Sequence, residues 1–191
     1  MIEIEYKFLI SEFLFEDIIK NFKLKNPIRQ VNNYFIDTDG VLRANHITVR
    51  IREYETNKLF QIKFKSNKSL ETHYKKQDHL AIREEYSREI YEISEITISE
   101  IENVTGIKIK DLVNVGSMIT HRYKFFIEEN VIIYLDKNEY LDTCDFEVEI
   151  EIYNKQEIDI NKILNKLNIT EYQDKIRGKC TRFLKALSER Q

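Results

Sequence analysis

Acidic side chains stand at alternate positions in two stretches of the sequence. Glu147, Glu149 and Glu151 occupy every second place in FEVEIE, and Glu3 and Glu5 do the same in EIEYK. Successive side chains of a β-strand point to opposite faces, so each set would form a row on one face. Like charges in a row repel each other unless a counter-charge lies near them. Carboxylate oxygens are typical ligands of Mg²⁺ and Mn²⁺, so these rows predict a divalent metal site.

Basic side chains form rows of the same kind in three other stretches. Arginine can bind phosphate oxygens through two parallel hydrogen bonds, and lysine supplies a compact positive charge. Basic rows together with a metal site therefore predict a metal-bound oligophosphate as the ligand. The paired basic residues are Arg50 and Arg52, Lys63 and Lys65, and Arg122 and Lys124.

Alternation by itself has a second interpretation, because a strand with one solvated face and one core face also alternates. A solvated face usually mixes both signs of charge with neutral polar residues. Here each row is of nearly one sign, which favours charged faces that point inward toward a ligand. The apolar faces would then point outward under amphipathic helices. A barrel with outward charged faces and an apolar cavity is the alternative.

Period-two alternation recurs along the chain more often than helical periodicity does. About eight strands and four helices with short connections favour an antiparallel-rich α+β fold, with a barrel or a strongly curved sheet. No linker or repeat divides the chain, so we expect one domain over residues 1–191. The expected strands cover residues 1–10, 29–38, 46–55, 58–65, 79–92, 117–140 (two strands across a turn at Glu128–Asn130) and 142–154, and the expected helices cover 11–20, 94–106, 158–169 and 179–190.

The composition is that of a soluble globular protein. Charged residues make up 33% of the 191 residues, but the net charge is only -3. This balance excludes a bulk attraction to nucleic acid or to acidic membranes. No signal peptide or membrane span is expected, and Cys144 and Cys180 are expected to be free thiols in a reducing compartment. We therefore expect a cytoplasmic protein with no membrane partner.

The ordered motifs resemble those of the CYTH superfamily, the triphosphate tunnel metalloenzymes, whose relatives include class IV adenylate cyclases and thiamine triphosphatases. EIEYK is similar to the ExExK signature of that family. The resemblance implies an eight-stranded antiparallel β-barrel, or tunnel, with flanking helices, which holds a triphosphate with one or two Mg²⁺ or Mn²⁺ ions. The other similar segments are NYFIDT, RIR, KFK, REEY, HRYK, FEVEIE and RGKCTRF.

The resemblance also implies roles for individual residues. Glu85 would orient a cation or a water molecule, and Glu85, Glu5 and Lys7 would be the catalytic residues. The implied metal ligands are Glu3, Glu5, Glu147 and Glu149, with Glu151 and Asp136 in addition. The implied triphosphate ligands are Lys7, Arg50, Arg52, Lys63, Lys65, Arg83, Arg122, Lys124, Arg177 and Lys179.

The function predicted from these features is metal-dependent hydrolysis of a small triphosphate: inorganic tripolyphosphate, thiamine triphosphate or a nucleoside triphosphate. No GxxxxGK[ST] loop is present, so a P-loop enzyme is excluded. Three alternatives stay open: an adenylate cyclase of the class IV type, an RNA 5′-triphosphatase, and a non-catalytic polyphosphate-binding module. Apart from an RNA 5′ end, no nucleic-acid partner is expected, and the oligomeric state, monomer or homodimer, is left open.

Overall fold

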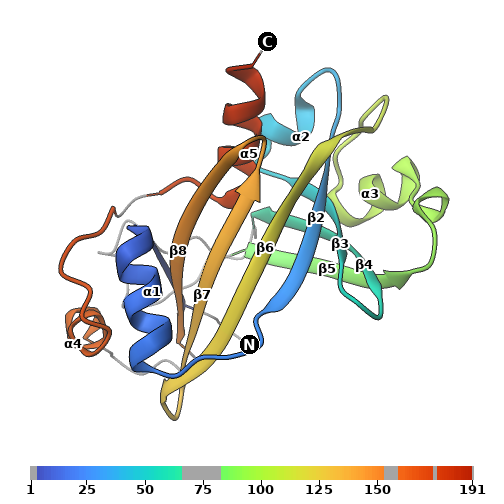
Figure 1. Cartoon of the computed structure of the whole chain (residues 1–191). Helices are drawn as coiled ribbons and strands as arrows, with labels where there is room; N and C mark the ends of the chain where they lie inside the picture. The colour runs from blue at the N-terminus through green and yellow to red at the C-terminus, as the bar shows by residue number, and fades with distance from the viewer. Residues whose placement is uncertain (1–3, 66–82, 153–158, 174–175, 191) are drawn as a thin grey trace. The chain divides into compact units, whose positions relative to one another are not determined.

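The computed structural model describes residues 4–65, 83–152, 159–173 and 176–190 (Figure 1). The chain divides into two compact units, and each is described by itself below. Unit 1 comprises Met1–Arg29, Asp78–Leu80 and Thr120–Gln191, and unit 2 comprises Gln30–Gln77 and Ala81–Ile119. The expectation of a single domain stays a prediction.

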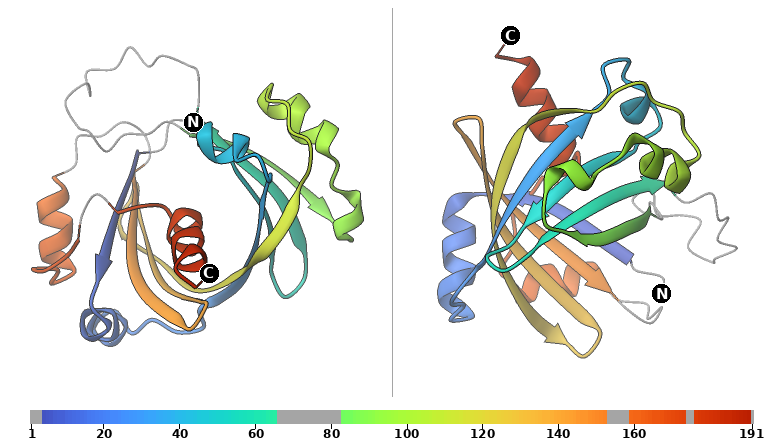
Figure 2. Two further views of the ribbon diagram at one scale, coloured as in Figure 1. Left: turned by 90° about the horizontal axis from the view of Figure 1, so that it is seen from above. Right: turned by 90° about the vertical axis from the view of Figure 1, so that its right-hand side faces the viewer.

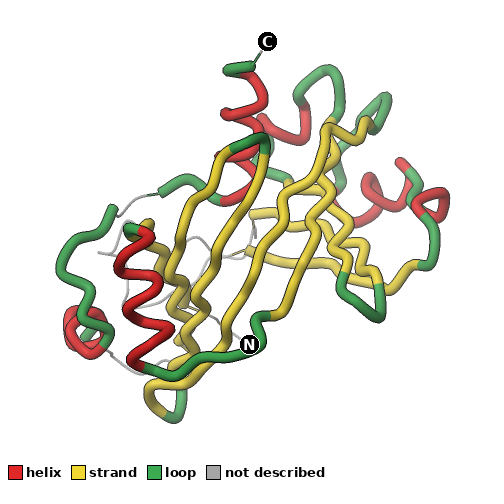
Figure 3. The backbone as a smooth tube through the Cα atoms, in the orientation of Figure 1, coloured by secondary structure: helices red, strands yellow, loops and turns green. Residues whose placement is uncertain are grey.

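Eight strands form one sheet, and their registered pairings are antiparallel, which confirms the predicted α+β fold class (Figure 3). The strand order is β1-β8-β7-β6-β2-β3-β4-β5, so backbone pairing among the described residues does not close the sheet into a ring. The strands are β1 (Ile4–Ile10), β2 (Ile28–Ile36), β3 (Thr48–Glu53), β4 (Lys58–Lys65), β5 (Arg83–Ile90), β6 (Val113–Glu128), β7 (Val131–Tyr140) and β8 (Thr143–Ile152).

In unit 1, β8 pairs with β1 on one edge and with β7 on the other. Lys7 of β1 lies opposite Glu149 of β8, and Asp136 of β7 lies opposite Glu147. Because side chains alternate along a strand, these residues share one face of the sheet. The first and last strands of the chain thus bring the predicted acidic rows together.

The opposite face of β8 is apolar and lies against helix α1 (Glu12–Asn21). Ser11 caps this helix by accepting a hydrogen bond from the Leu14 amide, as expected of an N-cap serine. Phe15, one helical turn along, is 3% exposed, and its ring lies 4.8 Å from the ring of Phe146. The prediction that the apolar face lies under a helix therefore holds for α1. A second helix, α4 (Ile160–Lys166), is capped at its N-terminus by Asp159, whose side chain accepts a hydrogen bond from the Asn161 amide.

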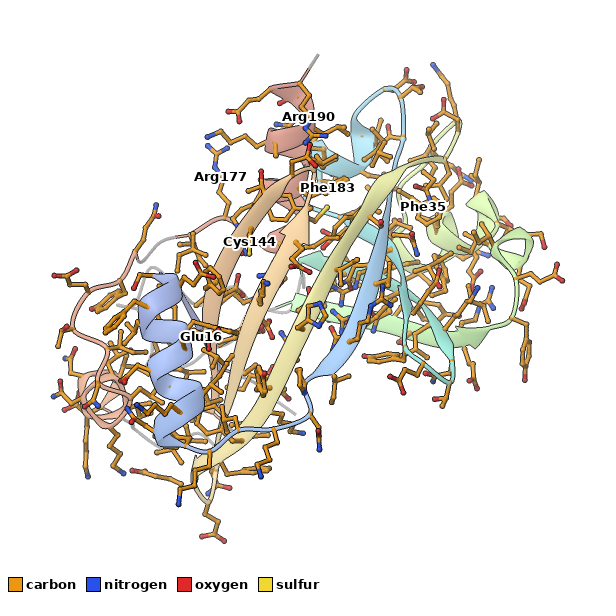
Figure 4. The ribbon with its side chains drawn as sticks, in the orientation of Figure 1. Glu16, Phe35, Cys144, Arg177, Phe183 and Arg190 are labelled. Atoms are coloured by element: carbon orange, nitrogen blue, oxygen red, sulfur yellow. The ribbon has the colours of Figure 1, made fainter. Side chains whose placement is uncertain are left out.

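Helix α5 (Lys179–Ser188) differs from the expectation that helices cover only the apolar faces. Figure 2 (left) shows α5 on the concave side of β7 and β8, with α1 on their convex side. Its Lys179 contacts Asp136 and Glu147, so α5 lies over the charged face. Phe183, labelled in Figure 4, is fully buried with its ring 6.3 Å from that of Tyr140. A helical pattern reveals an apolar side but not which sheet face it will contact.

In unit 2, the apolar faces of β3 and β4 form one core with α3 (Ile98–Thr105). Thr97 caps α3 by accepting from the Glu100 amide, and Gly106 ends it with a left-handed φ of 72°. The core also contains buried side chains from the turn regions. Its buried members are Phe35, Leu42, Ile47, Val49, Ile51, Phe60, Ile62, Ile90, Ile101 and Ile109.

A short helix, α2 (Val41–Ala44), was not predicted from the sequence. Asp37 accepts hydrogen bonds from the Val41 and Leu42 amides and so holds the start of this helix. Four residues are too few to show helical periodicity, so no pattern in the sequence predicts this helix. None of the helices in the described ranges is long and apolar enough to cross a bilayer.

Candidate functional site

The charged face of β1, β7 and β8 in unit 1 carries a group of acidic side chains, which we call the carboxylate cluster. Its members are Glu5, Asp136, Asp145, Glu147, Glu149 and Glu151. Asp136 and Glu147 have no exposed side-chain surface, and Glu149 has 6%. Buried carboxylates are costly unless they are paired, so the cluster requires cations.

Two of those cations come from strands. Lys7 lies 2.7 Å from Glu5 and 3.5 Å from Glu149. Arg122 of β6 donates two hydrogen bonds to Asp136, at 2.8 and 2.6 Å, and a third to Glu149 at 2.7 Å. The paired donation is the geometry that guanidinium and carboxylate groups favour.

The other two cations come from α5, one turn apart on the same side of the helix. Lys179 contacts Glu147 at 2.5 Å and Asp136 at 3.0 Å. Arg182 donates to both oxygens of Asp145 and to Glu147 at 2.6 Å. Helix α5 therefore supplies two of the four cations that the described residues bring to the cluster.

These surroundings move the pKa values of the acids in opposite directions. Burial is the largest influence on Glu5 and, together with the hydrogen bond and charge of Glu149, raises the pKa of Glu5 to about 7 despite the nearby Lys7. Burial also acts to raise the pKa of Glu149, but the charges of Lys7, Arg122 and Lys179 outweigh it and hold that pKa well below its usual value. At neutral pH, then, Glu149 is ionised while Glu5 is close to half protonated.

Two sets of three carboxylates in the described residues have ligand oxygens within 4.8 Å of one another: Glu5, Glu149 and Glu151, and Asp136, Glu147 and Glu149. Both sets offer only oxygen ligands, the donor type that Mg²⁺ and Mn²⁺ favour. The set with Glu5 also carries a carboxylate whose proton is held only up to about neutral pH. A divalent cation would displace that proton, so the donor set fits the predicted metal.

Unit 2 carries a second charged face, on β3, β4 and β5. Lys63 and Glu85 lie opposite each other in register, with their charged atoms 3.0 Å apart. Arg50 lies 3.6 Å from the same carboxylate. Burial acts to raise the pKa of Glu85, but the charges of Lys63 and Arg50 outweigh it, and the pKa is lowered. Glu85 is therefore an anion inside a basic group.

Neutral polar side chains hold the arginines of this face in place. Gln61 accepts from Arg50 at 2.9 Å and donates to Glu85 at 2.6 Å. Asn32 accepts from Arg52 at 2.9 Å. Each guanidinium is thus anchored through Nε by a neutral partner, which adds no negative charge to compensate it.

Most of the predicted site residues that the structure describes fall into these two groups. Arg177 is exposed and projects outward from the segment before α5 (Figure 4). Lys124 is also exposed, 5.8 Å from the ring centre of Tyr134. Lys65 and Arg83 lie opposite each other in β4 and β5, but their side chains are outside the described residues. Glu3 lies outside them as well.

Sequence reasoning missed several side chains that hold the charged residues of each group in place. Arg182 and Asp145 were not predicted, although Arg182 follows Lys179 by three positions, a spacing that puts both on one side of a helix. Tyr134 lies under Arg122, with the guanidinium carbon 4.3 Å from its ring centre, and was not predicted either. Gln61 and Asn32 are neutral, so a search for charged rows could not find them.

Each unit has antiparallel strands with an apolar face and a charged face, and the charged face carries clustered carboxylates in unit 1 and clustered bases in unit 2. The family model of the CYTH domain matches residues 1–177. The chain therefore belongs to the CYTH family, and the resemblance found in the motifs is confirmed. No curated protein sequence matches the chain.

Solved structures show the same fold. A candidate adenylate cyclase of Bacillus halodurans is similar with a TM-score of 0.76 and 23% identity, covering 95% of this chain and 97% of its own. A candidate adenylyl cyclase of Hippeastrum, described as having a dominant triphosphatase activity, has a TM-score of 0.72 and 18% identity and covers 96% and 95%. A Pyrococcus horikoshii protein has a TM-score of 0.61 and 20% identity, with 99% of both chains covered.

Proposed function

We propose that this protein hydrolyses a small triphosphate with the help of a divalent metal ion. The observation that carries the proposal is the carboxylate cluster, in which three acids with only oxygen donors lie within reach of one ion beside Lys7. A pure anion binder would have little use for such acids, since they repel phosphate. Membership of the CYTH family and the triphosphatase activity named for the Hippeastrum relative support the same reaction.

Glu5, Glu149 and Glu151 would hold the metal, with Glu3 as a further predicted ligand. When bound, the ion would neutralise phosphate oxygens and polarise the phosphorus under attack. Phosphoryl transfer depends mainly on positioning and charge neutralisation, so the basic side chains would provide the remaining positioning and neutralisation of the phosphates. Arg50, Arg52 and Lys63 would bind phosphate oxygens, as would Lys7 once a metal replaces it as the partner of Glu5.

Glu85 would position the attacking water as a hydrogen-bond acceptor. Its lowered pKa keeps it ionised at neutral pH, so it can accept this bond without first losing a proton. The same low pKa makes it a weak base, which suits orientation of the water better than full removal of its proton. The predicted ligands Lys65, Arg83, Arg122, Lys124, Arg177 and Lys179 stay part of the proposal.

The choice of Mg²⁺ or Mn²⁺ rests on donor chemistry. A cytoplasmic location of the protein is proposed because Cys144 and Cys180 are free thiols, which suit a reducing compartment. We keep the substrate as a class: inorganic tripolyphosphate, thiamine triphosphate or a nucleoside triphosphate. Cyclisation of ATP is the second candidate reaction, because two of the similar structures are described as candidate adenylate cyclases.

The test is phosphate release from these substrates and from 5′-triphosphorylated RNA, with Mg²⁺, with Mn²⁺ and with EDTA. We expect release that EDTA abolishes, and at least a hundredfold loss in Glu5→Gln, a typical cost of losing an essential catalytic group. Glu16→Gln on the exposed side of α1 (Figure 4) is the matched control and should keep full activity. Cyclic AMP formed from ATP without phosphate release would favour the cyclase instead, and no turnover of any substrate would overturn the proposal.

A further inference from the structure

The deeper of the two carboxylate sets already surrounds a cation. The ammonium of Lys179 lies 2.5 Å from Glu147, 3.0 Å from Asp136 and 3.6 Å from Glu149. It thus contacts one oxygen from each member of this set. These oxygens lie within 4.8 Å of one another, so a metal ion bound by all three would need the place that the ammonium takes.

The remaining oxygens of this set also have cationic partners. Arg122 contacts both oxygens of Asp136, and Arg182 contacts the second oxygen of Glu147. The second oxygen of Glu149 lies 3.5 Å from Lys7. Every carboxylate oxygen of the set is therefore within reach of a positive charge supplied by the chain itself. A divalent ion would have to displace several of these groups at once.

The shallower set, Glu5, Glu149 and Glu151, offers easier access. The side chains of Glu5 and Lys7 are 30% and 24% exposed, whereas Asp136 and Glu147 have no exposed surface. An ion arriving from solvent would displace the partly exposed Lys7 from Glu5, whereas an ion in the deeper set would have to displace Lys179, which is only 12% exposed. Access therefore favours the shallower set.

The net charge of the carboxylate cluster and its cations equals in magnitude the charge of one divalent ion. Six carboxylates meet four cations from the described part of unit 1: Lys7, Arg122, Lys179 and Arg182. When all six carboxylates are ionised, the cluster keeps two negative charges. Among the residues that the structure describes, one divalent ion balances these charges, and a second would give these groups a net positive charge.

We propose that the ammonium of Lys179 takes the place of a second metal ion, so that the protein binds one divalent ion, at Glu5, Glu149 and Glu151. The inference rests on the proposed function for the presence of a metal, and adds the number of ions and the residue that sets it. Lys179 is also a predicted phosphate ligand, and the inference adds a second task, the neutralisation of these three acids. With one ion bound, the positioning of the water stays with Glu85, as in the proposed function.

The test counts bound Mn²⁺ in the full-length protein by equilibrium dialysis, with free Mn²⁺ followed by electron paramagnetic resonance and no substrate present. We expect one ion per wild-type chain. Lys179→Met removes the ammonium and should raise the count to two. Lys179→Arg keeps the charge, and Lys185→Gln changes an exposed lysine of the same helix. Both of these should keep a count of one.

A wild-type count of two, or an unchanged count of one in a folded Lys179→Met protein, overturns the inference while the proposed function stands. A wild-type count of zero removes the metal and overturns both. Circular dichroism establishes whether Lys179→Met is folded. If it is not, the wild-type count decides alone: one ion supports the inference and two ions overturn it.

Discussion

Arg182 of α5 and Glu147 of β8 form an ion pair at 2.6 Å, in which the glutamate side chain has no exposed surface and the arginine only 11%. The same guanidinium also binds Asp145 through two hydrogen bonds. One side chain therefore connects the C-terminal helix to two acids of the sheet. Because the pair is buried, loss of the arginine leaves the charge of Glu147 with neither this counter-ion nor solvent to stabilise it.

Arg182→Gln should accordingly lower the free energy of unfolding by about 3 kcal/mol, in the range for breaking a buried ion pair. Urea denaturation at pH 7.5 measures this change. Arg190→Gln is the matched control, because Arg190 pairs with Asp142, which is 94% exposed. An exposed pair contributes at most about 1 kcal/mol. Equal losses in the two variants would contradict the buried role of Arg182.

The contact of α1 with the apolar face of β8 gives a second prediction. Phe15→Ala should lower the free energy of unfolding by about 3 to 5 kcal/mol, since Phe15 is 3% exposed and packs on Phe146. Phe13→Ala on the same helix should change it by less than about 0.5 kcal/mol, since Phe13 is 82% exposed. Urea denaturation compares them, and a small loss for Phe15→Ala would exclude the observed packing.

Glu85 gives a prediction in which binding and turnover move in opposite directions. Glu85→Gln removes the anion beside Lys63 and Arg50, so tripolyphosphate should bind more tightly in EDTA, as measured by calorimetry. Turnover should fall about a hundredfold, because the water loses its acceptor. Glu55→Gln, in the exposed turn between β3 and β4, should change neither. Unchanged turnover in Glu85→Gln would remove Glu85 from the mechanism.

The raised pKa of Glu5 predicts how stability depends on pH without metal. The folded protein holds this proton up to about pH 7, whereas the ordinary pKa of a glutamate carboxyl is 4.5. Its stabilising effect is therefore complete below about pH 4.5 and is lost as the pH rises through about 7. We expect the wild type in EDTA to lose about 1 to 2 kcal/mol between pH 5 and pH 8 relative to Glu5→Gln, a value reduced for the partial exposure of Glu5.

Urea denaturation of both proteins across this pH range provides the measurement. Glu16→Gln serves as the control and should follow the wild type, since Glu16 is an exposed side chain of α1. A parallel decline in wild type and Glu5→Gln would show that another group is responsible.

The rows of charge were predictable because a period of two is a local property of the sequence. The stripe of Glu147, Glu149 and Glu151 and the pair Arg50 and Arg52 each lie within one strand, so alternation alone assigned each of them to one face. The contact of Lys7 with Glu149 was not local, because it requires the first strand to pair with the last. Periodicity cannot predict this pairing, whereas the ordered motifs of the family imply that the two acidic rows line one site.

The position of α5 and the neutral partners were beyond the sequence patterns. The side of α5 that carries Lys179 and Arg182 could equally have faced solvent, and only tertiary packing decides between the two. Gln61 resembles any polar residue of a strand until its two hydrogen bonds to Arg50 and Glu85 are known. Features that depend on several strands or helices at once are therefore the ones that the sequence left open.

The family match ends at residue 177, and α5 begins at Lys179. A clone cut at the end of the match would keep every strand but would lose Lys179 and Arg182. Of the cations that the described residues bring to these buried acids, Asp136 would keep Arg122, whereas Glu147 would lose both Lys179 and Arg182. Recombinant work should therefore retain α5, and an affinity tag should be separated from this helix by a spacer and should not replace any part of it.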